Sequence, residues 1–174
     1  LVQSHVGEKV DWVAWSPDGL SMLVVTTGFN DTSPIPMARG PNRRGNRWRT
    51  LNRQSSLTIF DATSGKKLRT IAMTADSLGG AAWDPASTRI ATVSEIEGSR
   101  GYAATEIVLR VWDVATGGHL YSYSLGHPRR WQIDDAFSYT YRVAWSHDGR
   151  SIAVGSDFYL EIIPTTLKQL RSGW

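Results

Sequence analysis

The sequence Val-Leu-Arg-Val-Trp-Asp-Val-Ala-Thr-Gly, residues 108–117, reads as a β-strand that ends in a turn. Its β-branched, aliphatic and aromatic residues suit a pleated strand, and the Asp and the Ala-Thr-Gly supply turn chemistry. A near copy, Leu-Thr-Ile-Phe-Asp-Ala-Thr-Ser-Gly, occupies residues 57–65. The final glycines of the two copies, Gly65 and Gly117, lie 52 positions apart. The chain therefore repeats itself.

A second motif occurs three times, each time as a tryptophan followed by turn residues. It reads Trp-Ser-Pro-Asp-Gly at 15–19, Trp-Asp-Pro-Ala-Ser at 83–87 and Trp-Ser-His-Asp-Gly at 145–149. Pro and Gly at these positions favour a tight turn. An aliphatic residue follows each tryptophan after seven positions, namely Met22, Ile90 and Ile152. Each copy therefore predicts a strand, a tight turn and a second strand.

Interleaving the two motifs predicts a unit of four short strands. We expect strands near 10–15, 20–26, 57–61 and 67–72 in the first copy, near 80–83, 88–94, 106–113 and 119–124 in the second, and near 141–145, 150–155, 159–163 and 167–170 in the third. No helical periodicity competes with this pattern. Repeated four-strand units are typical of β-propeller blades, so we expect an all-β fold of antiparallel strands.

Composition narrows the class of protein. Of the 174 residues, 41% are hydrophobic and 10% aromatic, which is enough for a buried core. No apolar run is long enough to span a bilayer, so we expect no membrane segment. The absence of cysteine excludes disulfides and fits an intracellular, cytoplasmic protein, with the nucleus left open. The first residues lack an initiator Met and a signal pattern, so we expect a part of a longer protein.

The motifs together resemble the WD40-repeat family. The resemblance rests on the turns at 15–19 and 145–149, on Trp112-Asp113 with Ala-Thr-Gly after it, and on Gly126-His127. It implies about three propeller blades, at about 5–73, 78–125 and 139–171, with insertions at 28–56 and 95–105. Propellers carry about four to eight blades, so we expect a fragment of a larger ring or an arc completed by another chain. A TolB-like propeller with similar turns is the alternative family.

The WD40 resemblance also implies a hydrogen-bonded network within each blade, made by a His, a Ser or Thr, an Asp and a Trp. His5 and His127 stand at the implied histidine positions of the first and third copies. The second copy has Trp112, with Thr92 or Ser94 as its expected partner, but no corresponding His. The Trp is replaced in the other two copies, by Phe60 and Ile163. We therefore expect no complete network.

The extra residues of the three copies lie in connections that an antiparallel meander places on one face. They fall at about 28–56, 95–105 and 128–140, and the tight turns occupy the opposite face. The first insertion has six arginines against a single acidic residue. Its basic and aromatic residues are Arg39, Arg43, Arg44, Arg47, Trp48, Arg49 and Arg53. The 128–140 connection adds Arg129, Arg130 and Trp131.

Long loops on a rigid scaffold usually carry binding, so we expect a partner on the insertion-bearing face. The expected partners are other proteins, within a multi-subunit complex or a multidomain chain. The alternatives are RNA or another polyanion bound by the Arg-rich loop 39–53, or a solvated loop without a partner. A third hypothesis is that the chain forms part of an enzyme-associated, TolB-like propeller whose catalytic residues lie elsewhere.

The remaining candidates are expected to be structural. Trp15, Trp83 and Trp145 recur at one position, which favours packing in the core, and the same holds for Trp112. The aspartates assigned to turns or strand ends are Asp18, Asp113 and Asp148. The four histidines are scattered, which argues against a metal site, and no catalytic or cofactor motif occurs. We therefore expect a non-catalytic interaction scaffold without metal or cofactor.

Overall fold

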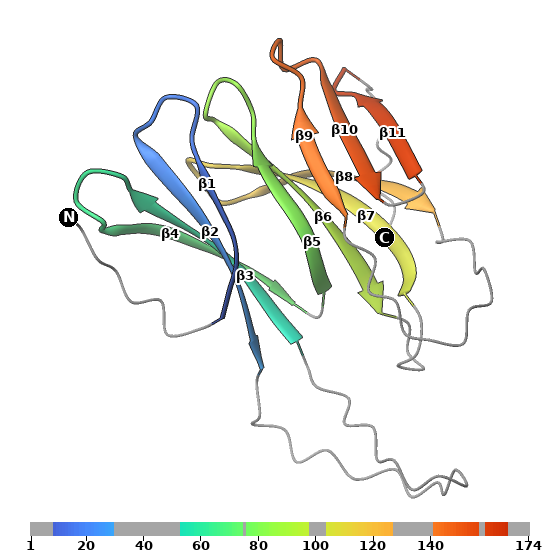
Figure 1. Cartoon of the computed structure of the whole chain (residues 1–174), viewed down its shortest axis with the longest axis horizontal. Helices are drawn as coiled ribbons and strands as arrows, with labels where there is room; N and C mark the ends of the chain where they lie inside the picture. Colours follow the sequence, from blue (N-terminus) through green and yellow to red (C-terminus); the bar gives the residue numbers. More distant parts are fainter. Residues whose placement is uncertain are drawn as a thin grey trace, which may run out of the picture.

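The computed structural model describes residues 9–29, 53–74, 76–97, 104–126, 141–156 and 159–166. Within these ranges the chain forms strands and turns, without a helix. The strands build three antiparallel sheets that follow one another along the chain (Figure 1). The all-β prediction is confirmed for this part of the protein.

The first two sheets are four-stranded meanders, as the repeat predicts. The first sheet runs β1 (Lys9–Trp15), β2 (Ser21–Phe29), β3 (Arg53–Asp61) and β4 (Lys67–Thr74), and the second runs β5 (Asp76–Trp83), β6 (Arg89–Glu97), β7 (Ala104–Asp113) and β8 (His119–Gly126). Strands β2, β3, β6 and β7 extend further into the connections than the sequence predicts. The insertions are therefore shorter than expected at both ends.

The third sheet has three described strands. They are β9 (Arg142–Trp145), β10 (Ser151–Ser156) and β11 (Tyr159–Pro164), with β10 in the middle. The strand predicted near 167–170 lies outside the described residues.

The same register recurs in each sheet. Trp15 pairs with Met22, Trp83 with Ile90, and Trp145 with Ile152. The third strand of each sheet continues the row, with Phe60, Trp112 and Ile163 opposite those aliphatic residues. Positions inferred from sequence repetition are therefore equivalent in space.

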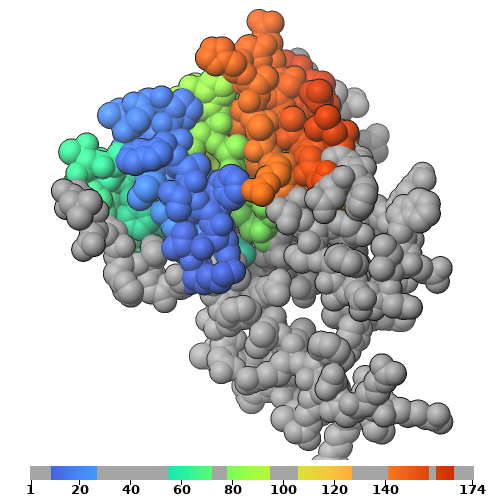
Figure 2. Space-filling view, in the orientation of Figure 1, coloured from blue at the N-terminus to red at the C-terminus, as the bar shows by residue number. Residues whose placement is uncertain are grey.

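The hydrophobic core forms two layers, one on each side of the second sheet. The layer toward the first sheet contains Leu23, Val25, Leu57, Ile59, Ile71, Ala81, Trp83 and Ile90. The layer toward the third sheet contains Ala91, Val93, Ile107, Leu109, Val111, Tyr141, Ile152, Val154 and Ile163. Figure 2 shows β5 and β6, in green, between the blue strands of the first sheet and the orange strands of the third. The second sheet is thus covered on both faces.

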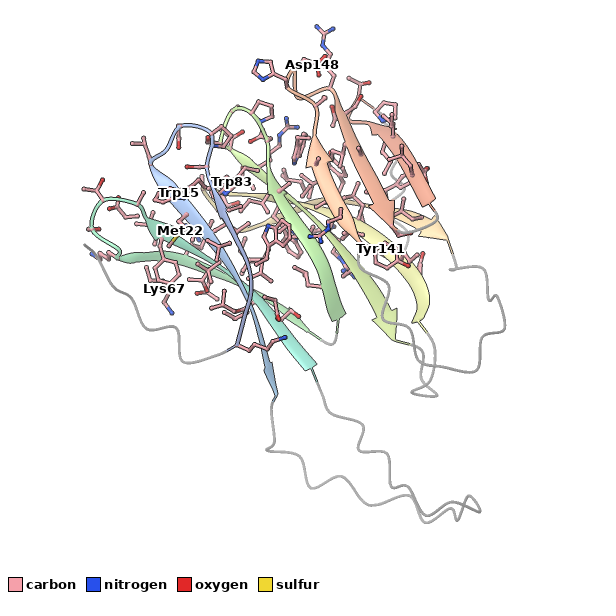
Figure 3. The ribbon with its side chains drawn as sticks, in the orientation of Figure 1. Trp15, Met22, Lys67, Trp83, Tyr141 and Asp148 are labelled. Atoms are coloured by element: carbon pink, nitrogen blue, oxygen red, sulfur yellow. The ribbon has the colours of Figure 1, made fainter. Side chains whose placement is uncertain are left out.

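The tryptophan of the first sheet does not lie in the core. Trp15 is 61% exposed, whereas Trp83, at the same position of the second sheet, is 7% exposed (Figure 3). Trp83 is covered because the first sheet packs against it, and no described sheet lies in front of Trp15. The prediction that Trp15 packs in the core is therefore wrong, although it holds for Trp83. Trp145 and Trp112 are partly buried and pack against the two core layers.

Two glycines let β5 and β9 approach closely. A Cβ added to Gly79 would lie 2.8 Å from Cβ of Tyr141, and one added to Gly80 would lie 3.1 Å from the Tyr141 carbonyl oxygen. Strand β5 also contacts β1, so the first strands of successive sheets are neighbours. Small residues in β5 are therefore a condition of the sheet-to-sheet packing.

Candidate functional site

The long connections leave the sheets at one end. Each sheet is an antiparallel meander, so the connections β2–β3, β6–β7 and β8–β9 depart from the end opposite the tight turns (Figure 1). Their residues, at 30–52, 98–103 and 127–140, lie outside the described ranges. The described strand ends nevertheless place the bases of all three connections at the same end of the sheets.

Most of the residues singled out for binding lie outside the described part. These are Arg39, Arg43, Arg44, Arg47, Trp48, Arg49, Arg129, Arg130 and Trp131, together with the histidines His5 and His127. Arg53 begins β3, but its side chain is not described. The role of these arginines and tryptophans in binding, and that of the two histidines in the repeat network, stay predictions.

At the opposite end, the aspartates hold the tight turns. The Asp61 carboxylate accepts hydrogen bonds from the backbone N–H and the hydroxyl of Ser64, at 2.7 and 2.6 Å. Asp113 accepts hydrogen bonds from the same two groups of Thr116, at 2.7 Å each. The hydroxyl bond, followed by the amide bond, lowers the pKa of each carboxyl below its ordinary value. Because hydrogen bonds to the charged form favour ionisation, these groups stay as turn acceptors at neutral pH.

The Trp-Ser-x-Asp-Gly turns follow the same scheme. Ser16 donates its hydroxyl to Asp18 at 2.5 Å, and Ser146 donates to Asp148 at 2.7 Å. This hydroxyl bond is the largest of the causes that lower the pKa of Asp18 and of Asp148. The sequence assignment of both aspartates to turns is confirmed.

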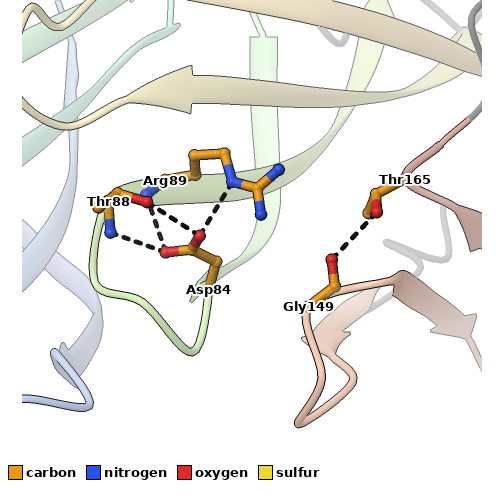
Figure 4. Close-up of polar contacts among 5 residues, drawn as sticks. All are labelled: Asp84, Thr88, Arg89, Gly149 and Thr165. Atoms are coloured by element: carbon orange, nitrogen blue, oxygen red, sulfur yellow. Dashed lines mark hydrogen bonds and ion pairs between the residues drawn. The ribbon is translucent and has the colours of Figure 1, made fainter.

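The second sheet builds its turn around a buried carboxylate. Asp84 has no exposed side-chain surface and accepts the Nε–H of Arg89 at 2.9 Å (Figure 4). It also accepts the backbone N–H groups of Thr88 and Arg89, at 2.8 and 2.9 Å. The Arg89 guanidinium carbon lies 4.6 Å from the centroid of the Trp145 ring. One ion pair therefore closes the β5–β6 turn and extends to the third sheet through a cation–π contact.

Of the two partners expected for Trp112, the structure shows Thr92. The Trp112 indole N–H donates to the Thr92 hydroxyl at 3.0 Å, while Ser94 accepts a hydrogen bond from Arg110 at 2.6 Å. His119 packs edge-on against Trp112, with ring centroids 5.3 Å apart. The Trp–Thr pair of the implied network is thus present in the second sheet.

Sequence reasoning missed three contacts between sheets. They are the Asp84–Arg89 pair with Trp145, the fit of Gly79 against Tyr141, and the Arg142 guanidinium carbon 5.3 Å from the Trp12 ring centroid. The Gly79-Gly80 dipeptide at the start of the strand predicted near 80–83 was a usable signal, since glycine in a strand marks a close approach of two backbones. The other two contacts join residues without a sequence pattern.

The described residues contain no cluster of three or more side chains suited to a metal ion. Among those same residues, no helix has the length and apolar character to cross a membrane. Comparison with protein-family models finds no matching family, and no curated protein matches the chain. The site must therefore be interpreted from its own residues.

Proposed function

We propose that this chain is a WD40-like, non-catalytic interaction scaffold, and that a partner protein docks on the end from which the long connections leave. The observation that carries the proposal is the shared position of those connections. Long connections follow strands β2, β6 and β8 at one end of the sheets, whereas tight turns join the strands at the opposite end. Loops presented together by a rigid sheet framework are where binding usually resides.

The packing of the sheets supports a rigid platform. Arg69 donates to the carbonyls of Thr116 and Ala115 at 2.9 and 2.6 Å, which ties the first sheet to the β7–β8 turn. The amide of Asp18 donates to the Ser87 hydroxyl at 3.1 Å, between the turns of the first two sheets. These bonds lie at the tight-turn end, so they stabilise the array without occupying the opposite end.

The resemblance to WD40 repeats supports a propeller arrangement of the sheets. Successive meanders pack face to face, and their first strands β1, β5 and β9 are neighbours. In a propeller, blades of four antiparallel strands surround a central channel. The partners proposed are proteins of a complex or of a multidomain chain.

The test removes the first long connection without disturbing the sheet. Phe29 pairs with Arg53 in the register of β2 and β3, so a two-residue Asn-Gly turn can replace residues 30–52. We expect unchanged circular dichroism and a similar melting temperature, because changes in loop length have a small effect on stability. We also expect that the proteins that crosslink to the intact chain no longer crosslink to the shortened chain. A matched variant keeps the loop length and replaces its six arginines by glutamine, so it separates the effect of charge on binding from that of loop length. The replaced residues are Arg39, Arg43, Arg44, Arg47, Arg49 and Arg53.

Two outcomes would overturn the scaffold proposal. If the shortened chain retains the same crosslinked proteins, the connection does not dock them. If the intact chain instead binds a labelled single-stranded RNA oligonucleotide, with affinity that falls steeply with salt and is lost in the Gln variant, the function is polyanion binding.

A further inference from the structure

Among the described residues, the first and third sheets each expose a strip of apolar side chains on the face turned away from the second sheet. On the first sheet, Val10, Val13 and Trp15 form a strip along β1 that is 42%, 50% and 61% exposed; we call it the front face. On the third sheet, Leu160 and Ile162 of β11 are 71% and 64% exposed, and we call their side the back face. Large exposed apolar residues gathered on one face mark an interaction surface.

The middle of the same chain shows what covers such a front face. Trp83 of the second sheet occupies the position of Trp15, and Ala81 that of Val13. Both are buried in the core layer against the first sheet, and the Trp83 indole N–H donates to the carbonyl of Ala14 at 3.3 Å. The fold therefore contains one complete example of a front face packed on a neighbouring sheet.

The middle of the chain also shows what covers a back face. Leu57 and Ile59 of β3 stand at the positions of Leu160 and Ile162, opposite Val25 and Leu23 in the first sheet. They are almost completely buried, because the second sheet packs on them. The exposed strip of β11 thus has large aliphatic residues at the two positions that, in β3, lie against a front face.

We infer that two copies of this chain associate head to tail, with the back face of one copy on the front face of the other. The contact repeats the packing of the first sheet on the second. Ala144 is equivalent to Ala14, so the Trp15 indole of one copy donates to the Ala144 carbonyl of the second copy. Leu160 and Ile162 cover Val13 and Trp15 there. This contact is independent of the insertion-bearing end in the proposed function.

A second copy is the occupant because both complementary surfaces belong to one chain and stand at opposite ends of its row of sheets (Figure 1). The second sheet lies between them, so the two faces of one copy do not meet. A head-to-tail contact uses each face once and generates a closed ring or a growing array. Each contact therefore covers one front face and one back face, and closure of a ring covers both faces of every copy.

Sedimentation velocity of the intact chain over a wide range of protein concentrations tests this. We expect a concentration-dependent increase in sedimentation coefficient for the wild type. Trp15→Lys on the front face and Leu160→Lys on the back face should each raise the dissociation constant by about tenfold or more, because each places a charge in an apolar contact. Leu120→Lys is the matched control, since Leu120 is 48% exposed on the second sheet and lies on neither outer face.

Mixing the two weakened variants distinguishes head-to-tail from symmetric association. The Trp15→Lys chain keeps a native back face and the Leu160→Lys chain a native front face, so the mixture should form dimers at concentrations at which each variant alone stays monomeric. Circular dichroism and thermal unfolding check that each variant is folded. A wild type that stays monomeric at every concentration, or a mixture that stays monomeric while the wild type associates, would overturn the inference.

Discussion

Asp84 and Arg89 form an ion pair across the β5–β6 turn, with the carboxylate Oδ2 2.9 Å from the guanidinium Nε. The corresponding position in the other two sheets holds a serine, whose hydroxyl accepts the backbone N–H five residues later at 2.9 Å in both Ser16 and Ser146. Asp84 accepts the equivalent amide of Arg89 at 2.9 Å and binds the side chain as well. The second sheet therefore retains the turn and adds an ion pair whose arginine makes a cation–π contact with Trp145.

Removing the buried carboxylate should strongly destabilise the protein. Asp84→Ala leaves the Arg89 guanidinium and two turn amides without their acceptor, so we expect the free energy of unfolding to fall by about 3 kcal/mol. Urea denaturation measures this loss. Asp84→Ser should lose less, because serine serves the same amide in the other turns, and Asp148→Ala at an exposed turn should lose least. Equal losses for Asp84→Ala and Asp148→Ala would contradict the structural role of the buried pair.

Stability should fall at acidic pH through the same carboxylate. Burial raises the pKa of Asp84, but hydrogen bonds from the amide and side chain of Arg89 and from Thr88 outweigh it and lower the pKa below 3.8. A pKa lower in the folded state stabilises the fold above the unfolded-state value of about 3.8, and this stability is lost as pH falls through the folded-state value. Urea midpoints measured from pH 6 downward, at roughly half-unit steps, should therefore fall less steeply in Asp84→Asn than in the wild type.

Ser87→Gly should stabilise the protein. Ser87 has a positive φ of 59°, and the equivalent residues Gly19 and Gly149 adopt 74° and 68°. A left-handed backbone conformation costs a residue with a Cβ about 1 kcal/mol relative to glycine. The substitution also removes the exposed hydrogen bond from the Asp18 amide, so we expect a net gain of about 0.5 kcal/mol in unfolding free energy. Ser87→Ala, which loses the hydroxyl and keeps the strain, is the control and should be destabilised.

Gly79→Ala should weaken the packing of the third sheet on the second. Its new Cβ would lie 2.8 Å from Cβ of Tyr141, so β5 or β9 must shift, at a cost of about 1–3 kcal/mol. Hydrogen exchange should rise mainly in β9 and β10. Gly80→Ala, whose Cβ meets an oxygen at 3.1 Å, should have a smaller effect. An unchanged exchange rate in β9 would show that the close approach is not required.

The two equivalent tryptophans should respond differently to truncation. Trp83→Ala removes a buried ring from the core layer and should lower the free energy of unfolding by about 3–5 kcal/mol. Trp15→Ala removes an exposed ring, so we expect a loss under about 1 kcal/mol in dilute, monomeric protein. Chemical denaturation at low protein concentration gives both values. A large loss for Trp15 in the monomer would mean that other parts of the chain cover it.

The strands, the tight turns and the repeated register follow from local sequence patterns. Alternating apolar residues and Pro, Asp and Gly at fixed offsets act within a few residues, so residues 83–87 and 145–149 predict their hairpins without knowledge of distant partners. The same local chemistry correctly assigned Asp18 and Asp148 to turns. The register of one sheet also limited the partner of Trp112 to Thr92 or Ser94, and the structure shows Thr92.

Which of the repeated residues are buried depends on how the sheets pack together. Trp15 and Trp83 have the same local sequence setting, yet one is exposed and the other packs in the core, because only Trp83 has a sheet in front of it. The contacts of Arg89 with Trp145 and of Gly79 with Tyr141 likewise join different sheets. A local pattern specifies a strand and its two faces, but the burial of a face depends on the neighbouring sheet, and the residues of that sheet lie far away in the sequence.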